Sequence, residues 1–195
     1  MIAIVDYGAG NISSVKKALE YLGAPAEVTS DPVVIAAAEK IVVPGVGHFS
    51  RCRALNENLR SSILEAVAAG KPFLGICVGM QWLFEGSTES PETPGAALFA
   101  GQCSKFPSAV KSPHVGWNQL EVNNGSQLLR GVASGAFVYY THSYRAPVVE
   151  QTVASTGYGG VFSAAVERGN IFGVQFHPEK SAATGLKVLE NFCAF

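Results

Sequence analysis

The first half of the chain alternates short apolar runs with longer stretches of mixed polarity. Most of the apolar runs end in turns that contain Gly or Pro, a pattern typical of buried strands in a parallel sheet. The sequence predicts such strands at Ile2–Asp6, Ala26–Thr29, Lys40–Val43 and Pro72–Ile76.

The stretches between these runs favour helices. The first has apolar residues at helical spacing from Asn11 onward and is followed by Gly23, a typical helix end. Two more helices are predicted, from about Phe49 to Ala69 and over Val78–Phe84. Strands separated by helices indicate a parallel, doubly wound α/β sheet.

The second half of the chain has a different pattern. A segment rich in Gly, Ser, Thr and Pro at Glu85–Gly95 predicts a surface loop, and Ala183–Phe195 predicts a final amphipathic helix. Between them, strand-like runs joined by turn signals indicate antiparallel additions to the parallel core. The runs are Ala97–Phe106, Val115–Val122, Ala136–Tyr140, Thr152–Ser155, Gly160–Val166 and Ile171–Phe176. With no visible linker or repeat, we expect a single domain over residues 1–195.

Composition narrows the classes of protein that fit. The chain has 195 residues, 48% of them apolar and only 15% charged, with a net charge of −1. A basic excess for binding nucleic acid or an anionic membrane is missing, and the hydrophobicity excludes disorder. So few charges suggest that some apolar surface meets a partner. The N-terminus lacks a secretory signal and no apolar run is long enough to span a membrane, so we expect a cytoplasmic protein.

The cysteines and histidines show no metal-ligand spacing. Four cysteines are scattered without a CxxC pair, and four histidines form no HExxH pattern. We therefore expect no disulfide framework, no metal and no cofactor.

The segment Gly75-Ile-Cys-Val-Gly79 carries the most chemical information. A G-x-C-x-G sequence between a strand and a helix has the form of a nucleophile elbow with Cys77 as the nucleophile. The sharp turn needs small neighbours, and the start of the following helix can lower the thiol pKa and hold an oxyanion. Taken alone, the motif also fits a buried structural cysteine between packing glycines.

A second segment, Gly173–Glu179, supplies a base for that thiol. In an extended backbone His177 and Glu179 project to the same side, and Pro178 favours that conformation. A Cys77–His177–Glu179 relay follows, in which the histidine accepts the thiol proton and the carboxylate orients the imidazole. Alone, His-Pro-Glu also fits a turn with a solvated carboxylate. A third segment, Pro44-Gly-Val-Gly47, ends a strand and can aim backbone N–H groups at an oxyanion, although it also fits an ordinary turn.

The three segments GICVGMQ, GVQFHPEKS and PGVG, in this order and spacing, resemble the motifs of the class I (triad) glutamine amidotransferases. The resemblance covers essentially the whole chain. It implies a flavodoxin-like α/β fold, with a mostly parallel twisted sheet, helices on both faces and antiparallel additions in the C-terminal half. It also implies hydrolysis of glutamine to glutamate and ammonia.

The resemblance assigns roles residue by residue. It implies that Cys77, His177 and Glu179 are catalytic. It implies an oxyanion hole formed by Val46, Gly47 and Val78, and substrate contacts from Gln81, Ser143 and Tyr144.

Further segments are similar to one subfamily, whose members work with a separate cyclase in histidine biosynthesis. These segments are DYGAGN, which starts at Asp6, PHVGWN, which starts at Pro113, and YYTHSY, which starts at Tyr139. The similarity implies a heterodimer with a (β/α)8-barrel cyclase subunit that receives the ammonia and releases imidazole glycerol phosphate and an aminoimidazole carboxamide ribotide. It places Asn11, Trp117, Tyr139 and Lys180 at the partner interface. Val78 is more often Leu in that subfamily, a mild departure because the position contributes its backbone N–H.

Other functions fit parts of the sequence. Gly8-Ala-Gly-Asn-Ile-Ser13 invites a dinucleotide-binding interpretation, but Ser13 stands where that fingerprint needs a third small residue, Gly or Ala. A free-standing Cys-His-Glu hydrolase, or another class I amidotransferase subunit, would also use the relay. A non-enzymatic binding module would not need Cys77, His177 and Glu179 together.

Overall fold

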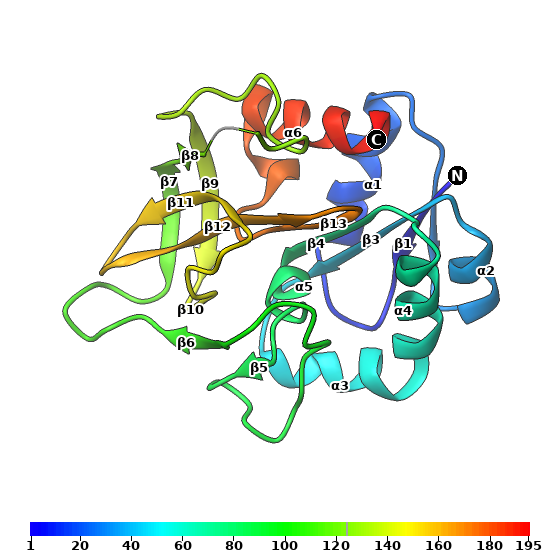
Figure 1. The fold of residues 1–195 in the computed structure, drawn as a ribbon, viewed down its shortest axis with the longest axis horizontal. Helices are drawn as coiled ribbons and strands as arrows, with labels where there is room; N and C mark the ends of the chain where they lie inside the picture. The colour runs from blue at the N-terminus through cyan, green and yellow to red at the C-terminus, as the bar shows by residue number, and fades with distance from the viewer. Residues whose placement is uncertain (124) are drawn as a thin grey trace.

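A twisted sheet of eight strands runs through the middle of the molecule (Figure 1). The computed structural model describes residues 1–123 and 125–195. The strand order is β2-β1-β3-β4-β13-β12-β11-β8; the first five strands are parallel and the last three are antiparallel additions. These strands are β1 (Ile2–Val5), β2 (Ala26–Thr29), β3 (Lys40–Gly45), β4 (Phe73–Cys77), β8 (Glu121–Val122), β11 (Thr152–Gly157), β12 (Val161–Arg168) and β13 (Ile171–Val174).

Helices cover both faces of the parallel part. On one face lie α1 and α6, and on the other lie α3, α4 and α5, with α2 packed beside α4 (Figure 1). The helices are α1 (Ile12–Tyr21), α2 (Pro32–Ala37), α3 (Cys52–Ala54), α4 (Arg60–Ala68), α5 (Val78–Gln81) and α6 (Ala182–Ala194). Because both faces are covered, β1, β4 and β13 are buried along their whole length. The flavodoxin-like α/β fold with antiparallel additions is thereby confirmed.

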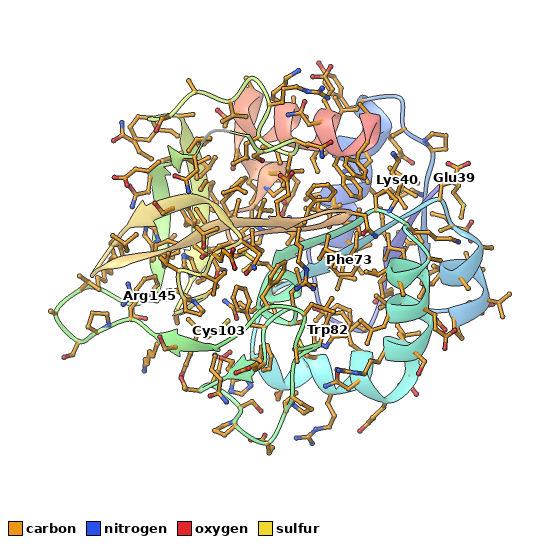
Figure 2. All side chains as sticks on the ribbon, viewed as in Figure 1. Glu39, Lys40, Phe73, Trp82, Cys103 and Arg145 are labelled. Carbon is orange, nitrogen blue, oxygen red and sulfur yellow. The ribbon has the colours of Figure 1, made fainter. Side chains whose placement is uncertain are left out.

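Aromatic side chains fill the space between the central strands and α3–α4. Phe73 and Trp82 lie there (Figure 2), with their ring centroids 6.3 Å apart and both rings fully buried. The indole N–H of Trp82 donates to the Asn56 side-chain oxygen at 2.9 Å, so the buried polar end of the ring is satisfied.

No helix in the described part of the chain has the length and apolarity that crossing a membrane requires.

Two smaller sheets lie beside the antiparallel end of the large one (Figure 1). Strands β5 (Gly86–Ser87), β6 (Gln102–Lys105) and β10 (Tyr144–Arg145) form one sheet, in the order β10-β6-β5. Strands β7 (His114–Gln119) and β9 (Phe137–His142) form the other as an antiparallel pair.

Several predicted elements differ from the observed ones. The predicted strand Val115–Val122 is wrong as one strand, because it divides at the buried Leu120 into β7 and β8, which join different sheets. The predicted strand Ala97–Phe106 is shorter, because Ala97 and Gly101 have φ values of +57° and +91° that no extended strand adopts. Only β6 forms there.

The helical segments also differ from their predictions. The predicted helix Val78–Phe84 stops at Gln81, because a returning segment bonds to the next carbonyls: the Leu98 N–H donates to Leu83 O at 2.8 Å. The predicted helix Phe49–Ala69 is divided by a π-helical segment at Leu55–Leu59. Helix α2 was not predicted from the sequence, although Asp31 caps it and Pro32 begins it.

The close packing of α5 on β3 yields a test of stability. A Cβ at Gly79 would overlap the carbonyl oxygen of Val43, so we expect Gly79→Ala to lower the free energy of unfolding by about 1–3 kcal/mol or more. Gly157→Ala is the matched control, because a Cβ added at Gly157 would have no atom of the described residues within 4 Å. Chemical denaturation of both variants measures the difference; equal stabilities would contradict the packing.

Candidate active site

Cys77 lies at the junction between β4 and α5. Its backbone has φ +54° and ψ −107°, a strained conformation for a residue with a side chain. A Cβ at Gly75 would lie 2.5 Å from the Gly79 carbonyl oxygen, so both flanking glycines are required by close packing. Because α5 is a single turn, the helix-dipole effect on the thiol that the sequence suggested is small.

The other three cysteines lie in different surroundings. All four are free thiols, and Cys52 and Cys103 are buried in the core. Burial raises the pKa of Cys52 to about 12 and raises the pKa of Cys103 as well. These two thiols are therefore poor nucleophiles.

His177 reaches the same edge of the sheet as Cys77 because β13 and β4 are parallel neighbours. Val174 is paired with Ile76, so the chain leaves β13 beside the point where it leaves β4. The ring Nδ1 of His177 lies 2.9 Å from Glu179 Oε1, and both side chains are buried. The contact is not made in an extended backbone as predicted, because Pro178 begins a 3-10 turn (Pro178–Lys180) that brings Glu179 back to the ring.

The charges around His177 favour its protonated form. Burial alone lowers the pKa of His177, but the neighbouring Cys77 sulfur and the Glu179 carboxylate outweigh it and raise that pKa above its usual value. The Nε2 atom is buried and has no hydrogen-bond partner among the described residues, which leaves it free to take or give a proton. The arrangement suits a thiolate–imidazolium pair.

Asn11 adds a second donor to Glu179. Its Nδ2 donates to Glu179 Oε1 at 3.3 Å, across a separation of 168 residues in sequence. Asn11 stands at the N-cap position of α1, yet its side chain makes no cap hydrogen bond. The side chain therefore orients the carboxylate instead of the helix.

The segment after β3 runs beside Cys77. Gly45 is paired with Cys77, so Val46 and Gly47 follow immediately next to the sulfur-bearing residue. Gly47 has a φ of +95°, which favours glycine, while Val78 is the buried first residue of α5. These positions allow backbone N–H groups from two elements to converge beside Cys77.

Gln81, Ser143 and Tyr144 meet between α5 and β10. The Gln81 side-chain N–H donates to Tyr144 O at 2.8 Å, and the Ser143 carbonyl accepts from the Phe106 N–H at 3.1 Å. The Tyr144 carbonyl also faces His142 Nδ1 at 2.8 Å, so both of its acceptor positions are used, whereas the Ser143 carbonyl can still accept a second hydrogen bond.

Three of the predicted interface residues form one surface patch. Trp117 on β7 is half-exposed and meets the Tyr139 ring at 6.0 Å, and Lys180 Nζ lies 5.9 Å from the centre of that same ring. Asn11 lies apart from this aromatic patch, on Glu179, which precedes Lys180 in the chain.

Two buried polar groups of the site were not predicted from the sequence. The Tyr7 hydroxyl is buried without a hydrogen-bond partner among the described residues and lies against Gly45. Burial raises the pKa of Tyr7 well above its usual value. Gln175 Nε2 lies 3.7 Å from Cys77 Sγ. A signal for Gln175 was available, because an amide inside the apolar run Ile171–Phe176 needs a buried partner.

The described part of the chain contains no candidate metal-binding site. No group of three or more His, Cys, Asp or Glu side chains is placed there to hold an ion.

Comparisons with known proteins agree over the whole chain. The sequence matches the profile of the family "Glutamine amidotransferase class-I" over residues 3–194. It is 48% identical to the imidazole glycerol phosphate synthase subunit HisH of Thermococcus kodakarensis, over 98% of each chain. It is 49% identical to the subunit of the same name from Methanothermobacter thermautotrophicus, over 98% of this chain and 97% of that one.

Solved structures show the same fold at low sequence identity. A structure described as a glutamine amidotransferase superposes with a TM-score of 0.78 at 18% identity, covering 100% of both chains. The structure of PurLQS from Thermotoga maritima superposes with a TM-score of 0.76 at 22% identity, covering 98% of this chain and 96% of that one.

The His177–Glu179 pair yields a pH test. We expect Glu179→Gln to lower the pKa of His177 by at least about one unit, because the carboxylate that stabilises the imidazolium is lost while the shape is kept. The ring therefore loses its proton at a lower pH in the variant. An NMR titration of the His177 ring measures this shift. Glu190→Gln, at an exposed partner of Lys187, is the control, and an unshifted His177 in Glu179→Gln would contradict the pairing.

Proposed function

The chain belongs to the class-I glutamine amidotransferase family, and we propose that it hydrolyses glutamine as the glutaminase of an imidazole glycerol phosphate synthase in histidine biosynthesis. The family match covers residues 3–194, and relatives 48–49% identical over nearly the full length are subunits of that synthase. The observation that carries the chemistry is the buried His177–Glu179 pair beside a cysteine in a strained elbow.

The reaction is an acyl transfer through Cys77. The thiolate attacks the carboxamide carbon of glutamine, a C–S bond forms, and the carbonyl electrons move onto oxygen. The tetrahedral intermediate collapses, the C–N bond breaks, and the protonated His177 gives its proton to the leaving ammonia. Water then attacks the thioester while His177 accepts its proton, and glutamate leaves as the thiolate is restored. Glu179 keeps the imidazole oriented and stabilises its charged form.

The oxyanion is stabilised by backbone N–H groups beside Cys77. We assign these donors to Val78 and to the Val46–Gly47 segment, because Gly45 is paired with Cys77 and α5 begins at Val78. The glycines on either side of Val46 lower the conformational energy needed to rotate its peptide group. The segment can therefore present either a carbonyl or an N–H to the site. One missing donor costs about 2.7–4 kcal/mol in such sites.

Gln81, Ser143 and Tyr144 complete the substrate pocket in this proposal. Gln81 sits one helical turn after Cys77, and its amide is held by Tyr144 O. Their place beside the nucleophile supports a role in holding the amino-acid end of glutamine.

A partner subunit receives the ammonia. The relatives are subunits of a synthase, which implies an assembly of at least two chains. We assign the partner as a (β/α)8-barrel cyclase that passes the ammonia to its own substrate. Its products are imidazole glycerol phosphate and an aminoimidazole carboxamide ribotide. The Trp117–Tyr139–Lys180 patch supports docking at this face, because half-exposed aromatics are enriched in interfaces. Asn11 bonds to Glu179, which directly precedes Lys180, and we assign it to the same interface. A free-standing hydrolase is disfavoured, because both relatives named above are synthase subunits.

Replacing Cys77 separates glutamine hydrolysis in this chain from ring formation in the partner. We expect Cys77→Ala to lower glutamine hydrolysis by a factor on the order of 10⁶ while the fold and the complex persist, because the attacking group is gone. Free ammonia should restore imidazole glycerol phosphate formation by the complex, since ring formation belongs to the partner. Assays with glutamine and with ammonium salt measure both. Cys52→Ala is the control that should keep activity; failure of ammonia to rescue an assembled complex would contradict the division of labour.

The Val46–Gly47 segment makes the activity depend on the partner. Glutamine turnover should be low for the chain alone and should rise by roughly 10²–10³ with the cyclase carrying its nucleotide substrate, because one oxyanion donor is then restored. Steady-state rates for the chain alone, with cyclase, and with cyclase plus substrate test this. Equal rates in all three would remove the switch and revive the free-standing hydrolase.

A further inference from the structure

Gln175 is a fully buried amide directly after β13. Its neighbours Val174 and Phe176 are apolar and fully buried, and its backbone N–H donates to Ala164 O at 2.9 Å. The side chain therefore has no access to water and must find its partners inside the protein. It finds two, the Gln81 amide and the Cys77 sulfur.

The orientation of this amide follows from its neighbours. Tyr144 O can only accept, so the atom of Gln81 that lies 2.8 Å from it is the NH₂ group. The same NH₂ group lies 3.2 Å from Gln175, so the Gln175 atom facing it is the carbonyl oxygen. The Gln175 NH₂ group is thereby turned toward Cys77 Sγ, at 3.7 Å.

A pair of neutral histidines fixes the far end of this chain of hydrogen bonds. His142 Nδ1 lies 2.8 Å from the same Tyr144 O, so it carries the proton, and its Nε2 accepts from His114 Nδ1 at 3.2 Å. Burial lowers the pKa of His114 to about 4 and that of His142 to about 3, which keeps both rings neutral. His114 is also stacked on the Tyr158 ring, with the ring centroids 4.0 Å apart, so packing as well as hydrogen bonding holds its ring.

We propose that Gln175 is a further catalytic residue, whose amide N–H donates to the Cys77 sulfur and stabilises the thiolate. This inference rests on the proposed function, in which that thiolate is the nucleophile. A thiolate accepts hydrogen bonds better than a thiol or a thioester, so the N–H supports the charged sulfur before attack and again when glutamate leaves. Because Oε1 is held by Gln81, the donor is positioned before the substrate arrives.

Other groups also act on the charge of the sulfur. The His177 imidazolium favours the thiolate from one side, backed by Glu179, while burial raises the pKa values of Tyr7 and Cys103 and keeps both groups uncharged near neutral pH. Gln175 differs from His177 because it is uncharged and donates at every pH. Its removal should therefore move the ionisation of Cys77 without taking a charged group out of the site.

Two variants of Gln175 separate donation from packing. Gln175→Met keeps the volume and removes the donor, whereas Gln175→Glu, in its ionised form, keeps an acceptor for Gln81 and also removes the donor. Ultraviolet thiolate absorbance, taken as the difference from the same protein carrying Cys77→Ala, follows the ionisation of Cys77 in the full chain. We expect the midpoint to rise by about one to two pH units in Gln175→Met, and further in Gln175→Glu, where a negative charge is added.

Glutamine hydrolysis supplies an independent readout. In Gln175→Glu the kcat should fall by roughly ten- to a hundredfold near neutral pH with little change in KM, because the Gln81 contact is kept and thiolate is lost. Asn191→Leu is the matched control: Asn191 is another buried amide, bonded to Leu128 O and Arg130 O at 2.8 Å, and its loss should affect stability without moving the Cys77 midpoint.

The outcomes distinguish this inference from the proposed function. An unshifted Cys77 midpoint in folded Gln175→Met would overturn the role of Gln175, and glutamine hydrolysis through Cys77 would still stand. A midpoint that shifts equally in Asn191→Leu would also overturn it, since the effect would then be one of general stability. If Cys77→Ala left hydrolysis intact, the proposed function itself would fail, whatever Gln175 does.

Discussion

The site depends on the parallel pairing of β4 with two neighbours that are far from it in sequence. Pairing with β3 sets Gly45 beside Cys77, and pairing with β13 sets Val174 beside Ile76. Because all three strands run the same way, their carboxyl ends lie at one edge and bring the elbow, the Val46–Gly47 segment and His177 together. If β4 shifted its register by one residue, each of its side chains would point to the opposite face of the sheet, and the residues of the site would no longer lie together.

Burial is the second constraint, because removing His177 and Glu179 from water disfavours their charged forms. Desolvation alone would keep His177 neutral, and an unpaired carboxylate at Glu179 would be costly. The molecule offsets this with fixed donors: His177 Nδ1 and Asn11 Nδ2 share one oxygen of Glu179. Loss of either donor would leave the buried Glu179 carboxylate with less compensation for its desolvation.

Local patterns predicted the parallel half of the fold well, because its buried strands and helix ends have clear signatures. The elbow could be predicted from its two glycines, and backbone packing explains why both are needed. The division of Val115–Val122 between two sheets could not be predicted from the sequence. It depends on which distant strands pair with each half, β9 with β7 and β11 with β8. Asn11 was predicted as an interface residue on resemblance; its bond to Glu179 spans 168 residues, which no local pattern contains.

The position of β13 has a consequence for how the protein acquires its reactivity during synthesis. This strand follows every other strand of the large sheet in sequence, yet it lies between β4 and β12 in space. Until it is inserted, β4 and β12 are open edges, and neither Gln175 nor His177 is near the thiol. A chain that has completed β12 but has not yet inserted β13 therefore carries Cys77 as an ordinary thiol, without the imidazole and the amide that lie beside it in the folded protein.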